Sequence, residues 1–436
     1  MKKHLVSIWE GINNDPKTIL LVLCAGLLIY FRDTRYFTNP RFWAEEGTLH
    51  FAFSFNHPWF QALVQPQVGY LNFFPNLATV LATFVPLESA PLVTTLAAFV
   101  VQLIPITIIL LSSSPPWQRW WRKIVGCAVV LFVPLTHEGW LNTINSFTFF
   151  AAITFLILLE DAPQTASKRW FFRTLLILAG LSGVLACSLI PLFIIIAWLD
   201  KSRERWLQAA LLSICSVIQL LVILSFRGGG EIGERFFWIG FSTLGITFWT
   251  QSILLFTTGY RNAHEWGKIF RMMIVNQPAQ FMLWGKTLFV AALAWIGTAT
   301  INLKSRVRNL FLYSIAILIL LFTVFSIIPD KYSFFNTGLH QRAFLAPNMI
   351  LGWMLLAGIN IPKGKGLMVL IRKSASYLCA VCLALALFWG AVRYFTARVP
   401  QSEWYDWRAE VAAWRVDQNY HLRIQPEPWV MELGKK

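Results

Sequence analysis

The chain has 436 residues, of which 56% are hydrophobic and only 13% are charged. A soluble protein carries roughly twice that charged fraction, so a soluble globular fold is excluded. The net charge of +16 does not indicate nucleic-acid binding, because the basic residues form short clusters between apolar runs, where they act as topology signals.

The chain begins with Lys2, Lys3 and Lys17 before an apolar run at 18–31, and no small-residue cleavage site follows. We therefore expect an uncleaved first span with a cytoplasmic N-terminus. Connectors rich in Lys and Arg should also be cytoplasmic: 117–123, 168–173, 201–205, 304–308 and 363–373. The opposite set then faces outward: 32–67, 137–142, 227–235, 329–342 and the tail from 393.

Apolar runs recur along nearly the whole chain and predict an all-α polytopic membrane protein of about 10 to 12 spans. Residues 174–199 have basic flanks on both sides, so we expect a hairpin of two short helices with a break around Ser188 and Pro191. An outward segment and a cytoplasmic connector must be separated by an odd number of membrane crossings. The apolar runs in 67–115 and in 236–301 do not give an odd number. In each, either a positive connector lies outside, or one run is re-entrant or lies along the interface.

The outward loop 32–67 is long for a connector and carries the adjacent acids Glu45 and Glu46. Residues 44–56 can form a helix with Leu49, Ala52 and Phe53 on one side. Glu46 and His50 are then i and i+4 and project together. A carboxylate here can act as a general base, Glu46 with His50 can bind a divalent cation such as Mg²⁺ or Mn²⁺, or the acids can simply favour the helix N-terminus.

Two further outward segments carry polar residues at helix ends. Residues 136–145 include His137, Glu138, Asn142 and Asn145, and amides at this depth usually face the bundle interior or a wet cavity. For Glu138, a carboxylate reaching back to the interface is the alternative. Residues 329–344 include Lys331, His340 and Arg342, three side chains at the outer end of a span. Arg342 can hold a phosphate or anchor the span at the interface. These loops are distant in sequence but lie on one predicted side, which favours a polar site at the outer mouth of the bundle.

The tail, 393–436, differs from the membrane part, 1–392. Residues 402–415 predict an amphipathic helix with Trp404, Trp407, Val411 and Trp414 on one stripe. A short extended element interrupted by Pro426 and Pro428 follows. We expect this tail to form a small packed cap on the outer face.

Several of these elements together resemble the GT-C superfamily of integral membrane glycosyltransferases. They are W-A-E-E-G at 43–47, G-Y-L-N-F-F-P at 69–75, E-x-x-x-N at 138–142, L-A-C-S-L-I-P-L at 185–192 and the late outer Arg342. The family often has Asp in the acidic pair where this chain has Glu-Glu, which leaves open whether Glu45 or Glu46 acts. The size and small outer tail are similar to bacterial enzymes that decorate O-antigen or related lipopolysaccharide glycans.

The resemblance implies a GT-C-like bundle in the bacterial inner membrane with an extracytoplasmic active site. Either Glu45 or Glu46 would deprotonate a hydroxyl of a glycan or lipid acceptor, which attacks a polyprenyl-phosphate-linked sugar with inversion. The resemblance assigns the donor phosphate to Arg342, Arg41 and Lys331. Substrate orientation would fall to Glu138, Asn142, Asn145, His137 and His340.

Two other functions stay open. A transporter or lipid flippase would place polar residues near the bilayer midplane and often shows inverted repeats, of which the sequence has no sign. A non-catalytic scaffold of envelope assembly would use the tryptophan-rich tail as its docking face.

Overall fold

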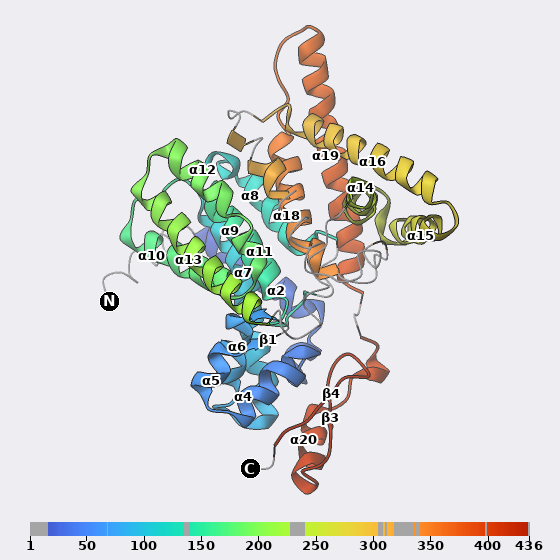
Figure 1. Ribbon diagram of the computed structural model, residues 1–436. Coiled ribbons are helices and arrows are strands. Elements are labelled where there is room, and N and C mark those ends of the chain that lie inside the picture. Colours follow the sequence, from blue (N-terminus) through green and yellow to red (C-terminus); the bar gives the residue numbers. More distant parts are fainter. Residues whose placement is uncertain are drawn as a thin grey trace. The chain divides into compact units, whose positions relative to one another are not determined.

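The computed structural model describes residues 16–67, 69–134, 139–226, 240–303, 308–309, 312–317, 335, 341–396 and 399–434. It is 77% helical, and the described residues contain only two short antiparallel β-hairpins (Figure 1). The chain folds into two compact units, the first formed by 1–111, 139–228 and 395–436 and the second by 112–138 and 229–394. The tail predicted as a separate cap is thus part of the first unit. We call residues 395–436 the C-terminal cap.

The first unit contains most of the short elements. Its helices are α2 (Pro16–Arg32), α3 (Arg35–Thr38), the π-helix η1 (Glu46–Phe51), α4 (Ala52–Asn56), α5 (Trp59–Val64), α6 (Phe73–Ala82), the 3₁₀ turn η2 (Leu87–Ser89), α7 (Ala90–Leu111), α9 (Ser146–Leu159), α10 (Ala166–Leu181), α11 (Val184–Cys187), α12 (Ile190–Asp200), α13 (Arg203–Phe226), the 3₁₀ turn η7 (Gln401–Glu403) and α20 (Trp407–Val416). Its strands pair as β1 (Pro66–Gln67) with β2 (Tyr70–Leu71) and β3 (Leu422–Arg423) with β4 (Val430–Met431).

The second unit is built from longer helices. They are the 3₁₀ turn η3 (Pro115–Trp117), α8 (Trp120–Phe132), α14 (Phe241–Phe248), the π-helix η5 (Trp249–Leu254), α15 (Leu255–Asn276), α16 (Pro278–Thr300), α18 (Gln341–Gly358) and α19 (Leu367–Tyr394). Trp353 of α18 donates from Nε1 to the carbonyl of Gly126 in α8 at 3.1 Å, which ties these two helices together.

Four helices in the described residues are long and apolar enough to cross a membrane: Leu87–Leu111, which joins η2 and α7, and the helices α13, α16 and α19. The bent pair α10 with α11–α12 makes a fifth if it is one span. At 1.5 Å per residue, the 22 residues of α7 reach about 33 Å, enough for a hydrocarbon core of about 30 Å. The predicted membrane-type helical architecture is confirmed at this level, and the figure of 10 to 12 spans stays a prediction.

The helix α9 is the buried centre of the first unit. Every one of its 14 residues except Phe147 is buried, because a helix that is apolar on all faces must be covered on all sides. Helices α7, α10 and α11 pack around it. Arg205 covers its C-terminal end by donating to the carbonyls of Ile157 and Glu160, which lack partners within the helix.

Residues 174–199 do not form one straight helix, as predicted: α10 and α11–α12 meet at an angle of 115°, which fits either a hairpin or a broken span. The sharp bend lies earlier than expected, at Ser182 and Gly183, and the predicted interruption at Ser188 separates α11 from α12. Gly183 has φ +144°, a backbone conformation that side-chain-bearing residues rarely adopt, and this permits the sharp reversal. Pro191 instead lies in the first turn of α12, where its missing N–H is tolerated.

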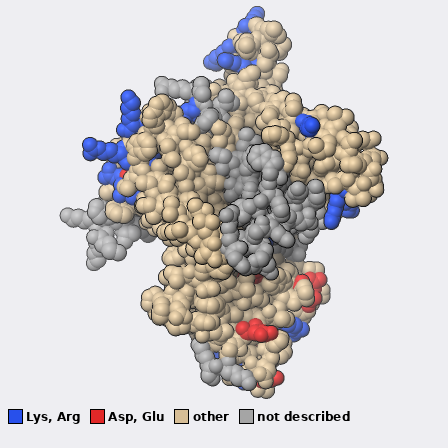
Figure 2. All heavy atoms as spheres, viewed as in Figure 1, with Lys and Arg blue, Asp and Glu red and all other residues tan. Residues whose placement is uncertain are grey.

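The first unit has a charged end and a loop end. At the charged end, the two predicted basic connectors meet, because Arg173 forms an ion pair with Glu204 and Lys168 lies 2.8 Å from Glu160. Figure 2 shows Lys and Arg gathered beside α10 and α12. The loop that carries Glu45 lies at the opposite end of α9, about 21 Å away along the helix axis. This is the arrangement expected if the basic end is cytoplasmic.

Candidate active site

The C-terminal cap holds the first loop in place (Figure 1, red beside blue). Gln425 donates its backbone N–H to Phe42 and accepts from Ala44, so one residue of the cap clamps both sides of Trp43. The two segments share a hydrophobic core with η2, α6 and α7. Its buried members are Phe42, Phe51, Ala52, Ala82, Leu87, Ala90, Trp407, Val411, Trp414, Leu422, Ile424, Met431 and Leu433. Burial of each large side chain contributes roughly 1.5–3 kcal/mol, which makes the cap an integral part of the loop's fold.

The tail is packed against the first loop, and its position on an outer face stays a prediction. The helix α20 begins at Trp407 rather than at residue 402, because the Asp406 side chain accepts from the N–H of Arg408 and caps it there. Trp404 precedes the helix and is nevertheless buried, its Nε1 donating to the carbonyl of Asn39 at 3.1 Å.

The glycine of W-A-E-E-G is required by this packing. A Cβ at Gly47 would lie 2.7 Å from Cδ1 of Ile424, closer than carbon atoms approach, and 3.0 Å from Cβ of Phe42, an unusually tight contact. Gly47 thus lets β3 and the following residues of the cap lie directly against the π-helix η1.

Glu46 is buried, and both of its carboxylate oxygens are used. Its Oε1 accepts from the N–H of Thr143 at 2.8 Å and from the Thr143 hydroxyl, and its Oε2 accepts from the N–H of Trp43 at 3.3 Å. Burial raises the pKa of Glu46, and the hydrogen bonds from Thr143, Trp43 and Thr94 oppose that rise. Glu46 therefore ties the first loop to the turn before α9.

Glu45 is the available member of the pair. It is half-buried, and no described residue donates a hydrogen bond to its side chain. The residue before it, Ala44, has φ +42°, an uncommon left-handed conformation that turns the chain between the clamped Trp43 and the anchored Glu46. The two adjacent acids thus have different surroundings.

His50 and Glu46 do not form the pair expected from i, i+4 spacing. His50 is buried and bonds through Nδ1 to Oδ1 of Asn76 at 2.6 Å, and burial lowers its pKa to about 4. Asn76 donates to the carbonyls of Leu63 and Gln65, which leaves its Oδ1 as the acceptor and makes Nδ1 of His50 the donor. The described residues contain no group of three or more His, Cys, Asp or Glu arranged to hold a metal ion.

The helix expected over 44–56 is also different in kind. Its first part, η1, is a π-helix with a wider turn, and only 52–56 is α-helical. Of the residues expected on one side of that helix, Ala52 is buried and Leu49 is 36% exposed.

Asn142 and Asn145 are both buried and lie in the turn before α9. The Asn142 side chain accepts from the N–H of Asn145 and donates to the carbonyl of Trp140, both at 3.1 Å. These bonds shape a turn in which Leu141 has φ +46°. Asn142 thus lies one residue from the Glu46 partner Thr143.

Arg41 is buried beneath the cap. Its Nη2 donates to the carbonyl of Arg423. Its Nε and Nη1 are buried and have no hydrogen-bond acceptor among the described residues. Burial lowers the pKa of Arg41 to about 10, and the nearby positive charge of Arg423 adds to that effect. The negative charge of Glu410 opposes this lowering, but the Glu410 carboxylate already accepts from Arg423 and from the hydroxyl of Tyr420.

The remaining predicted residues fall elsewhere. Arg342 is half-buried in the first turn of α18, in the second unit. His137, Glu138, Lys331 and His340 lie outside the described residues. Within the first unit, the structure brings together Arg41, Glu45, Glu46, His50, Asn142 and Asn145 around one end of the helix bundle.

Sequence reasoning missed the buried partners of these residues. Thr143 and Asn76 hold the two ionisable groups of the loop, yet neither is distinguished by its spacing from the other polar residues around it. A usable signal existed in principle, because an isolated polar residue in a predicted span needs a partner. The sequence does not say which partner.

Comparison with family models, curated proteins and solved structures finds no match to this chain.

Proposed function

We propose that the chain is an integral membrane glycosyltransferase. It transfers a sugar from a polyprenyl-phosphate donor to a hydroxyl of a surface glycan or lipid acceptor, at the outer face of the bacterial inner membrane. The observation that carries the proposal is the unequal acidic pair. A fully bonded, buried Glu46 fixes the loop, and the adjacent half-buried Glu45 carries no hydrogen bond from any described residue.

Glu45 is the general base of the proposed reaction. It takes the proton of the acceptor hydroxyl while that oxygen bonds to the anomeric carbon. The bond between the anomeric carbon and the phosphate oxygen breaks, and its electron pair leaves with the phosphate. Attack opposite the leaving group inverts the anomeric centre, and a phosphate leaving group needs no general acid.

Glu46 is a positioning residue in this scheme. Its oxygens are filled by the Thr143 and Trp43 donors, so they are not available to a substrate hydroxyl. Asn142 supports the same turn through its bonds to backbone atoms. In this scheme Glu46 holds the loop in place and Glu45 accepts the proton.

Cationic groups must hold the donor phosphate. Two donors of the Arg41 guanidinium have no acceptor among the described residues, and an oxyanion would satisfy them. Arg342 and Lys331 stay in the proposal as further phosphate ligands, and Glu138, Asn145, His137 and His340 as substrate-orienting groups. A divalent cation is not carried into the mechanism, since His50 is bonded to Asn76 rather than facing Glu46.

The structure weakens one alternative. A scaffold that docks through its tryptophan-rich tail needs those rings at the surface, but Trp404, Trp407 and Trp414 are buried within the first unit and only Trp429, at 37%, is exposed. A transporter remains the competing function that an experiment must separate.

The test uses purified protein in nanodiscs with polyprenyl-phosphate-linked sugars and an acceptor glycan. Glu45→Gln should lower the transfer rate by about 10²–10⁴-fold while the protein stays folded. The exposed Glu432 of the cap gives the matched control. Glu432→Gln makes the same substitution in the first unit at a residue whose ion pair is with His421 and not with the loop. Full transfer by Glu45→Gln would remove Glu45 from the mechanism. Transbilayer movement of the intact donor without any transfer would favour a transporter.

A further inference from the structure

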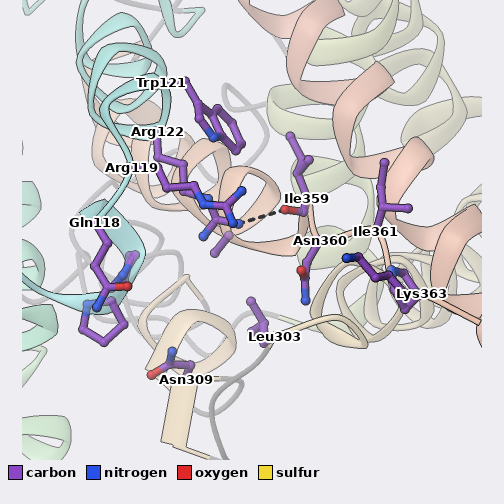
Figure 3. Close-up of a pocket in the computed structure, with 14 residues that line it drawn as sticks. Gln118, Arg119, Trp121, Arg122, Leu303, Asn309, Ile359, Asn360, Ile361 and Lys363 are labelled. Atoms are coloured by element: carbon purple, nitrogen blue, oxygen red, sulfur yellow. Dashed lines mark hydrogen bonds between the residues drawn. The ribbon is translucent and has the colours of Figure 1, made fainter.

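The second unit contains a cavity of about 740 Å³, a size typical of small-ligand sites (Figure 3). The start of α8 and the turn η3 form one wall, and the segment after α18 forms another. Figure 3 shows Arg119 and Arg122 extending from the first wall, and Asn360 and Lys363 belonging to the second.

The charge of the cavity lining is entirely positive. Arg119, Arg122 and Lys363 line it, and none of its 14 lining residues is Asp or Glu. Burial lowers the pKa of Arg122, and the positive charge of Arg119 lowers it further, so the two guanidinium groups repel each other. An anion between the walls would relieve that repulsion.

Hydrogen-bond donors in the cavity are held in position. Arg122 donates from Nη2 to the carbonyl of Ile359 at 2.9 Å, which fixes its guanidinium across the two walls. Its Nε is buried and has no acceptor among the described residues. The backbone of Asn360 is also fixed, because its backbone N–H donates to the hydroxyl of Ser376 at 2.9 Å. Gln118 and Asn309 add two more amides to the lining.

The rim of the cavity is apolar and exposed. Trp121 is 40% exposed and Ile361 is 54% exposed, and both line the cavity. Leu367 and Met368, at the start of α19 a few residues past Lys363, are 75% and 60% exposed. Tryptophan and basic residues beside exposed apolar side chains are typical of the level of lipid headgroups.

We propose that this cavity binds the phosphate group of an anionic ligand, and that in a membrane the ligand is an anionic phospholipid headgroup. Arg119, Arg122 and Lys363 supply the charge, and the amides of Gln118, Asn309 and Asn360 supply further hydrogen bonds. The cavity lies among the connectors predicted to be cytoplasmic, and it includes no residue of the proposed transfer site. The two proposals therefore fail independently.

The experiment measures thermal stability of the detergent-purified chain with phosphatidylglycerol, with phosphatidylcholine and with inorganic phosphate. Phosphatidylglycerol should raise Tm in a saturable way, and phosphatidylcholine should not. The double variant Arg119→Gln/Lys363→Gln, which leaves the Arg122 bond to Ile359 intact, should weaken the phosphatidylglycerol effect by about tenfold in concentration. Raising salt from about 0.1 M to 0.5 M should weaken it in the wild type as well.

Two controls separate the outcomes. Lys268→Gln removes an exposed cation of the same unit whose only described ion pair is with Glu265, and it should respond to phosphatidylglycerol as the wild type does. Lys363→Gln alone tests the site should the double variant be unstable. Equal protection by inorganic phosphate, lost in the double variant, would assign the same site to a soluble phosphate. Equal protection by both lipids, unchanged in the variants, would overturn the proposal.

Discussion

Thr143 donates to a single oxygen of Glu46 from both its backbone N–H and its hydroxyl, joining two segments 97 positions apart in sequence. This relationship is the mechanical basis of the proposed site. Thr143 lies in the turn three residues before the buried α9, so the position of the acidic pair is set by the end of that helix.

Removal of the Thr143 hydroxyl should destabilise the protein. Thr143→Val leaves the buried Glu46 carboxylate with one donor fewer, at a cost of about 1–3 kcal/mol. Heating followed by size-exclusion chromatography should show a clearly lower Tm. Thr154→Val is the control, since Thr154 is equally buried but bonds only to the carbonyl of Phe150 within α9. Equal losses in the two variants would contradict the special role of Thr143.

The stability of the first unit should depend on His50 in mildly acidic solution. The unfolded chain protonates His50 near its ordinary pKa of 6.5, whereas the folded protein does so only near 4. The unfolded state therefore binds more protons between these values, and the stability from neutral His50 is present above pH 6.5 and lost as pH falls to 4. The shift corresponds to ~3 kcal/mol.

His50→Gln isolates this effect, because glutamine can still donate to Asn76 but does not titrate. The fall in Tm between pH 7 and pH 4.5 should be smaller in the variant. Glu46 works in the opposite direction: its raised pKa makes stability decrease as pH rises above its ordinary value, and it does so in both proteins. Parallel pH profiles for the wild type and His50→Gln would show that His50 is not buried as the structure has it.

Gly47→Ala should loosen the cap. The new methyl group would meet Ile424 and Phe42 at 2.7 and 3.0 Å, so the cap or the π-helix must shift. Limited proteolysis should then cut the tail faster than in the wild type. Ile424→Val removes the Cδ1 atom of the closest contact, so Gly47→Ala/Ile424→Val should recover part of the resistance. No rescue would place the strain elsewhere in the loop.

Arg205→Met should be among the most damaging substitutions at the charged end. It leaves the carbonyls of Ile157 and Glu160 without their donors and should cost about 3 kcal/mol or more. Arg203→Met, two positions away and exposed, is the matched control. Yield and Tm of the purified variants provide the measurement. Similar behaviour of both would mean that the end of α9 does not need Arg205.

Composition and periodicity were sufficient for the helical class, for the division of 174–199 into two helices and for the buried stripe of α20. Each is a local property, because an apolar run or a stripe dictates which side chains leave water. The position of the sharp bend could not be predicted from the sequence. The need for glycine at 183 is visible only in its φ, and Pro191 is as common in the first turn of a helix as at a break.

The candidate site was only partly predictable. The acidic pair stood out because charge is rare in this chain, but its two members look alike in sequence. What separates Glu45 from Glu46 is Thr143, a partner 97 positions away that no local pattern selects. The π-helix η1 has the same limitation, because a single wide turn leaves no periodic signal in six residues.

The clamp by Gln425 also has a consequence for biogenesis. Gln425, which pairs with Trp43, is synthesised some 380 residues after it. The acidic loop is therefore made long before the residue that holds it. If the chain has the proposed function, its activity would be acquired only when the C-terminal cap packs against the loop. Under the proposed function, a chain that ended before β3 would lack the residue that clamps Trp43 and should not transfer sugar.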